Sequence, residues 1–205
     1  MSITLSTRRR TAVLALGAAL ALGVSACGSS GSGTTPATES SSSSTAGEIS
    51  AEHNDGDVAF INDMAPHHSG AVAMAELAPE RAGSAAVKDL AARIAAAQAP
   101  EVETMKAMAT AWGVSLSTDP GSMTGTTGMG GMGMGDDVSA LTPLRGAAFD
   151  REFLTRMTAH HTSALEMARA ELAQGQNAQA KELATSIIAS QEKEITEMAE
   201  LLKTV

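Results

Sequence analysis

The sequence predicts an all-α protein, a four-helix bundle built from two copies of one helical hairpin. The main observation is an internal repeat, because residues 57–75 and 150–168 are identical at 8 of 19 aligned positions. Residues 88–105 and 181–198 match at the same offset, at 8 of 18 positions. The composition agrees with helix, since alanine is abundant and aromatic residues make up only 2%.

The first 26 residues have the pattern of a lipoprotein signal peptide. Arg8, Arg9 and Arg10 precede an apolar stretch, residues 11–24, that is too short to span a membrane. Cys27 is the only cysteine and follows three small or apolar residues. We therefore expect it to carry a lipid at the mature N-terminus, rather than to be a buried thiol. The arginines fit either the general or the twin-arginine export route.

The remaining chain is predicted to have a tether and one domain. Residues 27–50 are rich in Ser, Thr and Gly and are expected to be a disordered tether, whereas residues 51–205 are long enough to build a core. Without the signal, 11 Lys and Arg oppose 23 Asp and Glu, giving a formal net charge of −12 (11 minus 23). This charge argues against nucleic acid as a partner. A single cysteine excludes an internal disulfide.

Each repeat is predicted to form a hairpin of two helices. In the first repeat, about 52–112, the apolar and histidine positions of residues 57–75 share one helical face, and so do those of residues 90–108. The second repeat, about 145–205, has the same pattern. The expected links within the hairpins are residues 79–86 and 174–178.

Two prolines fall inside the predicted helices of the first repeat. Pro66 and Pro100 each remove a backbone hydrogen bond, at a cost of about 3 kcal/mol unless the helix kinks or begins there. Their counterparts are Ala159 and Lys193, so we expect the second repeat to be the straighter one.

The two repeats are joined by a Met- and Gly-rich loop, residues 113–140. A polar, glycine-rich stretch of this kind is not expected to hold a packed element. It is either a flexible linker without function or a mobile arm that captures copper, and methionine is an unusual residue for a solvated glycine tract. The possible loop ligands are Met123, Met129, Met132 and Met134.

Methionine and histidine occur together on the first helix of both repeats. Met64 precedes His67 and His68 by three and four residues, which places the side chains on one face with β-carbons about 5–6 Å apart. Thioether and imidazole ligands together favour a soft cation, and they predict Cu(I), with Ag(I) as its mimic. The candidate ligands are Met64, His67, His68, Met157, His160 and His161, supported by Met74 and Met167.

Several polar residues are expected to lie on the inward faces beside these histidines. By accepting or donating hydrogen bonds, they would fix which ring nitrogen is free to bind. The candidates are Gln98, Glu101, Gln191 and Glu194, together with Asp57 and Asp150, for which capping a helix is the commoner role. A di-iron carboxylate site is disfavoured, because methionine stands three residues before each histidine pair, where such a site needs glutamate.

Two alternatives to copper binding remain open. Methionines at helical spacing often only pack a core, and buried histidines can form a polar network in a structural or partner-binding bundle without metal. A metal-dependent oxidoreductase would need an open coordination position. We expect no enzymatic activity, since the local sequence has no Ser-His-acid, Cys-His or phosphate-binding glycine motif. His53, at the end of the tether, is expected to be an incidental surface residue.

The doubled motif D-x-x-F-x-x-x-M-x-x-HH-x-x-A-x-x-MA, followed by Q-x-x-E-[VI]-x-x-M, resembles the family known as domain of unknown function 305. The similarity covers residues 52–205. It implies an exported, ferritin-like helical bundle of a family in which some members bind copper in the periplasm. Carried over to this chain, it implies the same Met and His ligand candidates. The Met-rich loop is not part of the shared motif.

Together these observations predict an exported copper-binding lipoprotein. It would be anchored through Cys27 at the outer face of the membrane or in the periplasm. There it would sequester Cu(I) or deliver it to a copper-transfer partner that the sequence does not identify.

Overall fold

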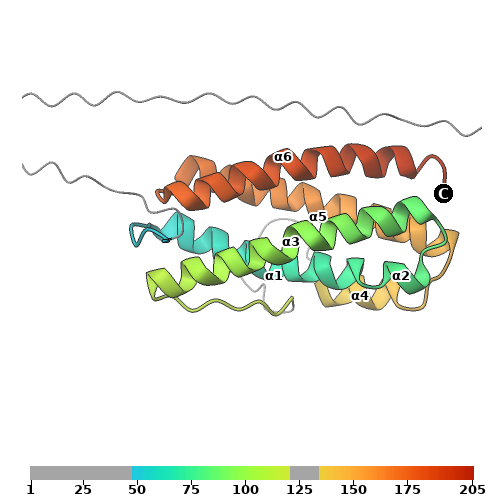
Figure 1. The fold of residues 1–205 in the computed structure, drawn as a ribbon, viewed down its shortest axis with the longest axis horizontal. Helices are drawn as coiled ribbons and strands as arrows, with labels where there is room; N and C mark the ends of the chain where they lie inside the picture. The colour runs from blue at the N-terminus through green and yellow to red at the C-terminus, as the bar shows by residue number, and fades with distance from the viewer. Residues whose placement is uncertain (1–47, 121–133) are drawn as a thin grey trace, which may run out of the picture. The chain divides into compact units, whose positions relative to one another are not determined.

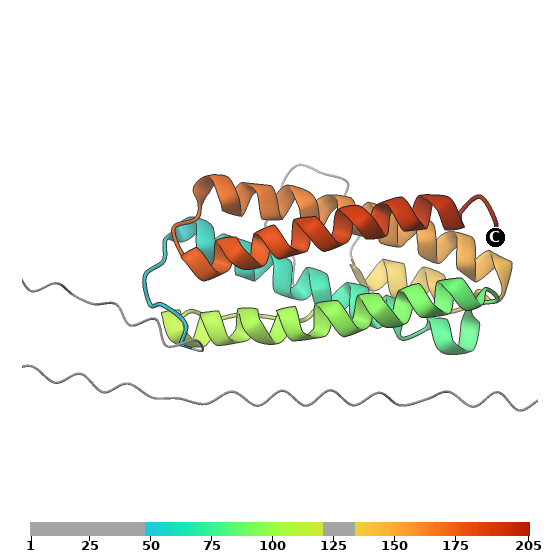
Figure 2. The same cartoon turned by 45° about the horizontal axis from the view of Figure 1, so that its top comes forward.

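The computed structural model describes residues 48–120 and 134–205, with side chains from residue 137 onward in the second range. Its long helices run side by side and confirm the predicted all-α bundle (Figures 1 and 2). Within the described residues, none of the helices has the length and hydropathy of a membrane span. The long helices are α1 (Asp55–Ala75), α3 (Ala85–Trp112), α5 (Ala147–Gln174) and α6 (Ala178–Leu201), and the short ones are α2 (Ala78–Arg81) and α4 (Met134–Leu141).

The helices pack as two hairpins joined through their first helices. Helix α1 packs along α3, α5 packs along α6, and α1 also packs on α5, whereas α3 and α6 touch each other only sparsely. Apolar side chains from these interfaces form two separate buried clusters. One cluster contains Phe149, Phe153 and Met157, and the other contains Phe60, Ile61 and Met64. The histidine pairs of α1 and α5 lie in the sequence between the segments that build the two clusters.

Two aspartates hold the hairpins together by capping each other's second helices. The Asp57 carboxylate, in the first turn of α1, accepts hydrogen bonds from the backbone N–H groups of Gln176 and Asn177, just before α6. The Asp150 carboxylate, in the first turn of α5, accepts the equivalent bonds from Gly83 and Ser84, just before α3. Of the two roles expected for these aspartates, the structure shows capping, because backbone amides occupy both carboxylates.

The Met- and Gly-rich segment was predicted to be a loop throughout, and this is wrong at its C-terminal end. Residues 134–141 form α4, whose Leu141 is fully buried in the cluster of Phe149. An ion pair of 2.5 Å between Asp137 and Arg156 fastens α4 to α5. Val138 and Leu141, three residues apart, form the apolar side of this helix. The glycine-rich sequence before them made this short apolar pattern difficult to identify as a helix. The predicted link 79–86 likewise contains the single turn α2.

Neither proline ends a helix in the first repeat. Helices α1 and α3 continue through Pro66 and Pro100, and neither begins at its proline. Most backbone hydrogen bonds of each helix are independent of the proline, and tertiary packing on both sides holds the helix together. Local propensity is therefore overridden here by burial.

The last residues of the predicted tether, 48–50, are packed on the bundle. Residues 48–54, here called the N-terminal segment, lie against the bundle end formed by the C-terminus of α3 and the start of α6. Ser50 is held through its backbone by Gln179, Trp112 and Asn177. His53 stacks on Trp112 with ring centroids 4.9 Å apart and is half-buried, so it is not an incidental surface residue.

Candidate metal centre

The two histidine pairs meet in the middle of the bundle. His67 and His68 of α1 and His160 and His161 of α5 are all buried, at most 5% exposed. The rings of His67 and His160 are in contact across the α1–α5 interface, with centroids 3.5 Å apart. Within each pair the centroids are 6.3 Å apart. The four imidazoles therefore form one group, here called the histidine layer.

The outer histidine of each pair is bound to a glutamate from the second helix of its own hairpin. Nε2 of His68 lies 2.8 Å from the Glu101 carboxylate, and Nε2 of His161 lies 2.7 Å from that of Glu194. A carboxylate only accepts hydrogen bonds, so each Nε2 carries the proton. These are the hydrogen bonds that were expected of the two glutamates.

The inner histidines, His67 and His160, have hydrogen-bond partners that differ from each other, because Ser163 is present in only one repeat. Nε2 of His160 donates to the backbone carbonyl of His67 at 2.9 Å. Ser163 donates its hydroxyl proton to the carbonyl of His160 at 2.9 Å, which leaves its oxygen free to accept from Nε2 of His67 at 2.6 Å. The first repeat has Gly70 at the equivalent position, so His160 has no serine partner.

Ser163 was not among the site residues predicted from the sequence. The available signal was the mismatch between Gly70 and Ser163 directly after the two histidine pairs. Its meaning depends on the contact between α1 and α5, which spans 96 positions of the chain.

All four imidazoles consequently present Nδ1 without a partner. Each Nδ1 is buried and has no hydrogen bond in the described part of the chain. Burial, followed by repulsion from the neighbouring imidazoles, holds the pKa of His67 and of His160 well below the ordinary value. Both rings are therefore neutral, with a lone pair on Nδ1. A lone pair on one nitrogen and a fixed proton on the other is the form in which histidine binds metal.

Two buried glutamines add further polar atoms to this region. Gln98 of α3 and Gln191 of α6 are 2% and 1% exposed, and each lies one turn before the glutamate of its helix. Neither the oxygen nor the nitrogen of either amide has a hydrogen-bond partner among the described residues. An amide without a partner is costly in an apolar interior, so these two side chains are further candidates for contact with a bound ion or water.

Methionine sulfur flanks the layer on both sides. Met64 and Met157 are fully buried, one turn before their histidine pairs, and belong to different apolar clusters. Met74 is fully buried in the cluster of Met157, and Met167 is partly buried against the cluster of Met64. The predicted thioether candidates are thus inside the bundle, in positions that also fill its core.

No three His, Cys, Asp or Glu side chains converge on one point in the ranges that the structure describes. The four layer imidazoles are among these side chains, so they lie together without forming a preassembled cluster of three ligands. Imidazole nitrogen and thioether sulfur are ligand types that suit a soft cation. Cys27, Met123, Met129 and Met132 lie outside the described residues, as does the side chain of Met134.

One further buried carboxyl lies away from the histidine layer. Glu171, in the last turns of α5, is 2% exposed, and its carboxyl lies beside that of Asp57, to which it can donate a hydrogen bond when protonated. Burial, together with the neighbouring Asp57 carboxylate, raises its pKa to about 8. A Cβ on Gly175 would overlap this carboxyl, so a larger residue there would have to displace the Glu171 side chain. The repeat gave no indication of this group, because the equivalent residue is Ala78.

The fold and the site define a class, a duplicated helical bundle with an internal layer of histidine and methionine. Over residues 57–202 the chain matches the domain of unknown function DUF305, and it belongs to this family. Among curated proteins no match was found.

Solved structures share this fold. A DUF305 protein from Streptomyces coelicolor, described as secreted, is 31% identical with a TM-score of 0.63, over 72% of this chain and 92% of that one. CopM in its Cu(II)-bound form is 32% identical with a TM-score of 0.61, over 72% and 95%. CopM has also been solved with Cu(I) and with silver. A DUF305 fragment from Deinococcus radiodurans is 25% identical with a TM-score of 0.62, over 74% and 98%.

Proposed function

We propose that this chain binds copper as Cu(I) in the histidine layer, and that it sequesters or delivers the ion rather than catalysing a reaction. The observation that carries the proposal is the set of four buried Nδ1 atoms, each without a partner among the described residues, whose opposite nitrogens are fixed as donors. A bundle that needed histidine only for structure would gain stability by pairing these atoms.

The chemistry of the neighbouring groups supports a soft cation. Met64 and Met157 supply thioether sulfur one turn from the imidazoles, supported by Met74 and Met167. Glu101 and Glu194 increase the basicity of the outer imidazoles by accepting their Nε2 protons. The similarity to CopM, which has been solved with copper and with silver, supports the same class of ion.

The proposal places the protein outside the cytoplasm. The signal pattern before Cys27 supports export and a lipid anchor, and the relative described as secreted supports export. The loop methionines Met123, Met129 and Met132, together with Met134 at the start of α4, would then offer thioether sulfur to the incoming ion.

Competition for Cu(I) against a chromophoric chelator tests the proposal. The purified chain, a variant with all four layer histidines changed to glutamine, and a matched His53→Gln control would be titrated under reducing conditions. We expect the wild type and His53→Gln to remove Cu(I) from the chelator, and the layer variant to lose this ability. Circular dichroism checks that each variant is folded, and His161→Gln alone replaces the fourfold variant if it is not.

Absence of competition by the wild type at micromolar affinity would contradict copper binding. Unchanged affinity of a folded layer variant would move the site to the Met-rich segment. The alternative, a structural histidine network, predicts two results. The layer variant loses stability in the absence of metal, and the wild type does not bind Cu(I).

A further inference from the structure

The outer histidines of the layer approach solvent through their glutamate partners. The side chains of His68 and His161 are 0% exposed, whereas those of their partners Glu101 and Glu194 are 17% and 12% exposed. Both glutamates belong to α3 and α6, the two long helices that touch only sparsely. The groove between α3 and α6 is therefore one side on which the layer approaches solvent.

One half of this groove is closed by an ion pair. Nη2 of Arg93 on α3 lies 2.5 Å from the Glu197 carboxylate on α6. Arg93 also binds Asp89 one turn earlier on its own helix, at 3.0 Å. These charges connect α3 and α6 on the half of the groove farther from the N-terminal segment.

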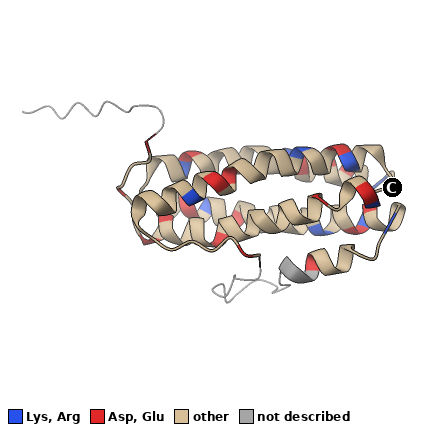
Figure 3. Cartoon of the chain, turned by 60° about the horizontal axis from the view of Figure 1, so that its bottom comes forward, with Lys and Arg blue, Asp and Glu red and all other residues tan. Residues whose placement is uncertain are grey.

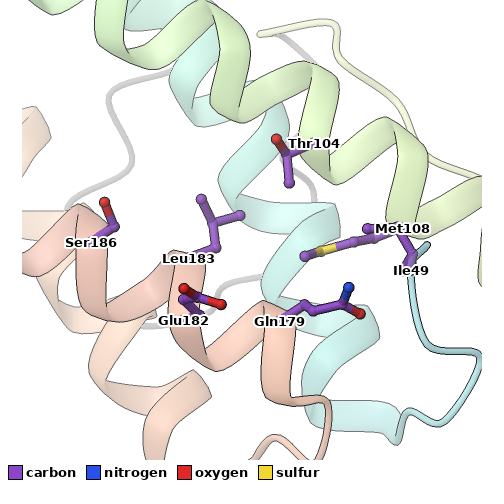
Figure 4. Close-up of a pocket in the computed structure, with 7 residues that line it drawn as sticks. All are labelled: Ile49, Thr104, Met108, Gln179, Glu182, Leu183 and Ser186. Atoms are coloured by element: carbon purple, nitrogen blue, oxygen red, sulfur yellow. The ribbon is translucent and has the colours of Figure 1, made fainter. Parts of the chain in front are cut away.

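The other half of the groove is open, because the residues equivalent to the ion pair differ between the two repeats. The internal repeat pairs Arg93 with Ser186 and Glu197 with Thr104, so two short side chains stand where the ion pair stands in the other half. A pocket of ≈ 350 Å³ lies at this point between α3, α6 and the N-terminal segment (Figure 4). Met108 and Glu182 are among the residues that line it.

This pocket lies close to the layer along α3. Thr104 is one turn from Glu101, the carboxylate that holds His68, and Met108 follows one turn further out. Figure 4 shows the Met108 side chain extending from its helix into the pocket, with the sulfur end pointing away from Ile49. A thioether and a carboxylate on this path offer a soft cation transient partners between solvent and the imidazoles.

We propose that Cu(I) enters and leaves the histidine layer through the open half of the α3–α6 groove, past Met108 and Glu101. This inference rests on the proposed function. It assigns Thr104 and Ser186 as the residues whose small size keeps the route open, and Arg93 and Glu197 as those that close the opposite half.

The test is to copy the ion pair into the open half. Thr104→Glu and Ser186→Arg together leave the net charge unchanged and alter two surface positions, and the single variants control for charge alone. Stopped-flow exchange of Ag(I) and Cu(I) with a chelator, using the full chain, would measure both rates and the equilibrium affinity. We expect the double variant to slow uptake and release by about tenfold each, with Kd unchanged. Ser186→Trp, an uncharged obstruction, should act in the same direction.

Exchange by the folded double variant and by Ser186→Trp at the wild-type rate would overturn the route while leaving copper binding intact. A rate that follows only the added charge, slower for Ser186→Arg and faster for Thr104→Glu with no effect of the pair, would also overturn it. If the wild type binds neither ion, the proposed function fails first and the route fails with it.

Discussion

Individual side chains in the bundle interior are arranged so that one nitrogen of each layer histidine is always free. The proton-bearing nitrogens of His68 and His161 are fixed by carboxylates, that of His160 by a carbonyl, and that of His67 by a serine hydroxyl. Ser163 achieves this because its own proton is already donated to the carbonyl of His160. This one residue also makes the two halves of the layer unequal.

Ser163→Ala should therefore be costly, although it removes only one oxygen. The Nε2–H of His67 would become a buried donor without an acceptor, and we expect the free energy of unfolding to fall by about 1–3 kcal/mol. Ser190→Ala is the matched control, since the Ser190 hydroxyl bonds only to carbonyls of its own helix. Urea denaturation measures both variants. Equal small losses in the two would show that Ser163 does not hold the ring of His67.

The sequence predicted the two histidine pairs, but it did not predict which ring nitrogen of each histidine carries the proton. The repeated Met-x-x-His-His pattern was sufficient to identify the imidazoles. The repeated Gln-x-x-Glu pattern of the second helices was sufficient to identify the glutamates. Neither pattern was sufficient to say which nitrogen is free. That depends on which atoms of α5 face α1, and no local pattern carries this information.

The helices are connected mainly through their ends. Asp57 and Asp150 each lie in the first turn of a first helix and cap the second helix of the other repeat, so each hairpin depends on its partner. Burial disfavours ionisation of Asp57, but hydrogen bonds from the backbone of Asn54, Asn177 and Gln176 hold its pKa below the ordinary value. Glu171 beside it is in the opposite situation, with its pKa raised to about 8.

Glu171 should make stability depend on pH. Its pKa is about 8 in the folded chain against an ordinary 4.5, so the folded state holds the proton more tightly. The stabilisation is complete below 4.5 and is lost as the pH rises to about 8. We expect a loss of about 1–3 kcal/mol over this window in the wild type relative to Glu171→Gln.

Comparison with Glu171→Gln at each pH isolates this effect, since the lowered pKa values of His67 and His160 act in the opposite direction. Chemical denaturation of both proteins across the window gives the difference. A constant difference at every pH would show that Glu171 is ionised in the folded protein.

The prediction of helices succeeded where apolar spacing was long and failed where it was short. The four long helices were predicted from runs of about twenty residues with one apolar face. Helix α4 was missed because only Val138 and Leu141 mark its buried side. The ordering of the N-terminal segment was missed because Trp112 and Asn177, which are distant in the sequence, hold its backbone.

The whole molecule has a pseudo-twofold arrangement with its polar layer between two apolar clusters. The clusters stabilise the fold, and the layer in between retains unsatisfied atoms at a cost in stability. Acidic and basic residues are both scattered along the helices of the bundle (Figure 3). The negative net charge of the chain favours the approach of a cation over that of an anion.

Binding of a soft ion should stabilise the whole bundle. An ion that binds only the folded state adds about 2.7 kcal/mol when its free concentration is about 100 times Kd. For a domain of this size we expect Ag(I) to raise Tm by about 5–10 °C. The His53→Gln control should keep this increase and a folded His161→Gln variant should lose most of it. The same increase in both variants would place the bound ion outside the layer.

The most direct test of the central claim is isotope-edited NMR of the histidine ring nitrogens, with and without Ag(I). The claim predicts that all four layer histidines of the metal-free protein carry the proton on Nε2. It also predicts that added Ag(I) shifts their Nδ1 resonances and leaves His53 unchanged. Protons found on Nδ1 in the metal-free protein, or silver shifts confined to residues outside the layer, would contradict the account.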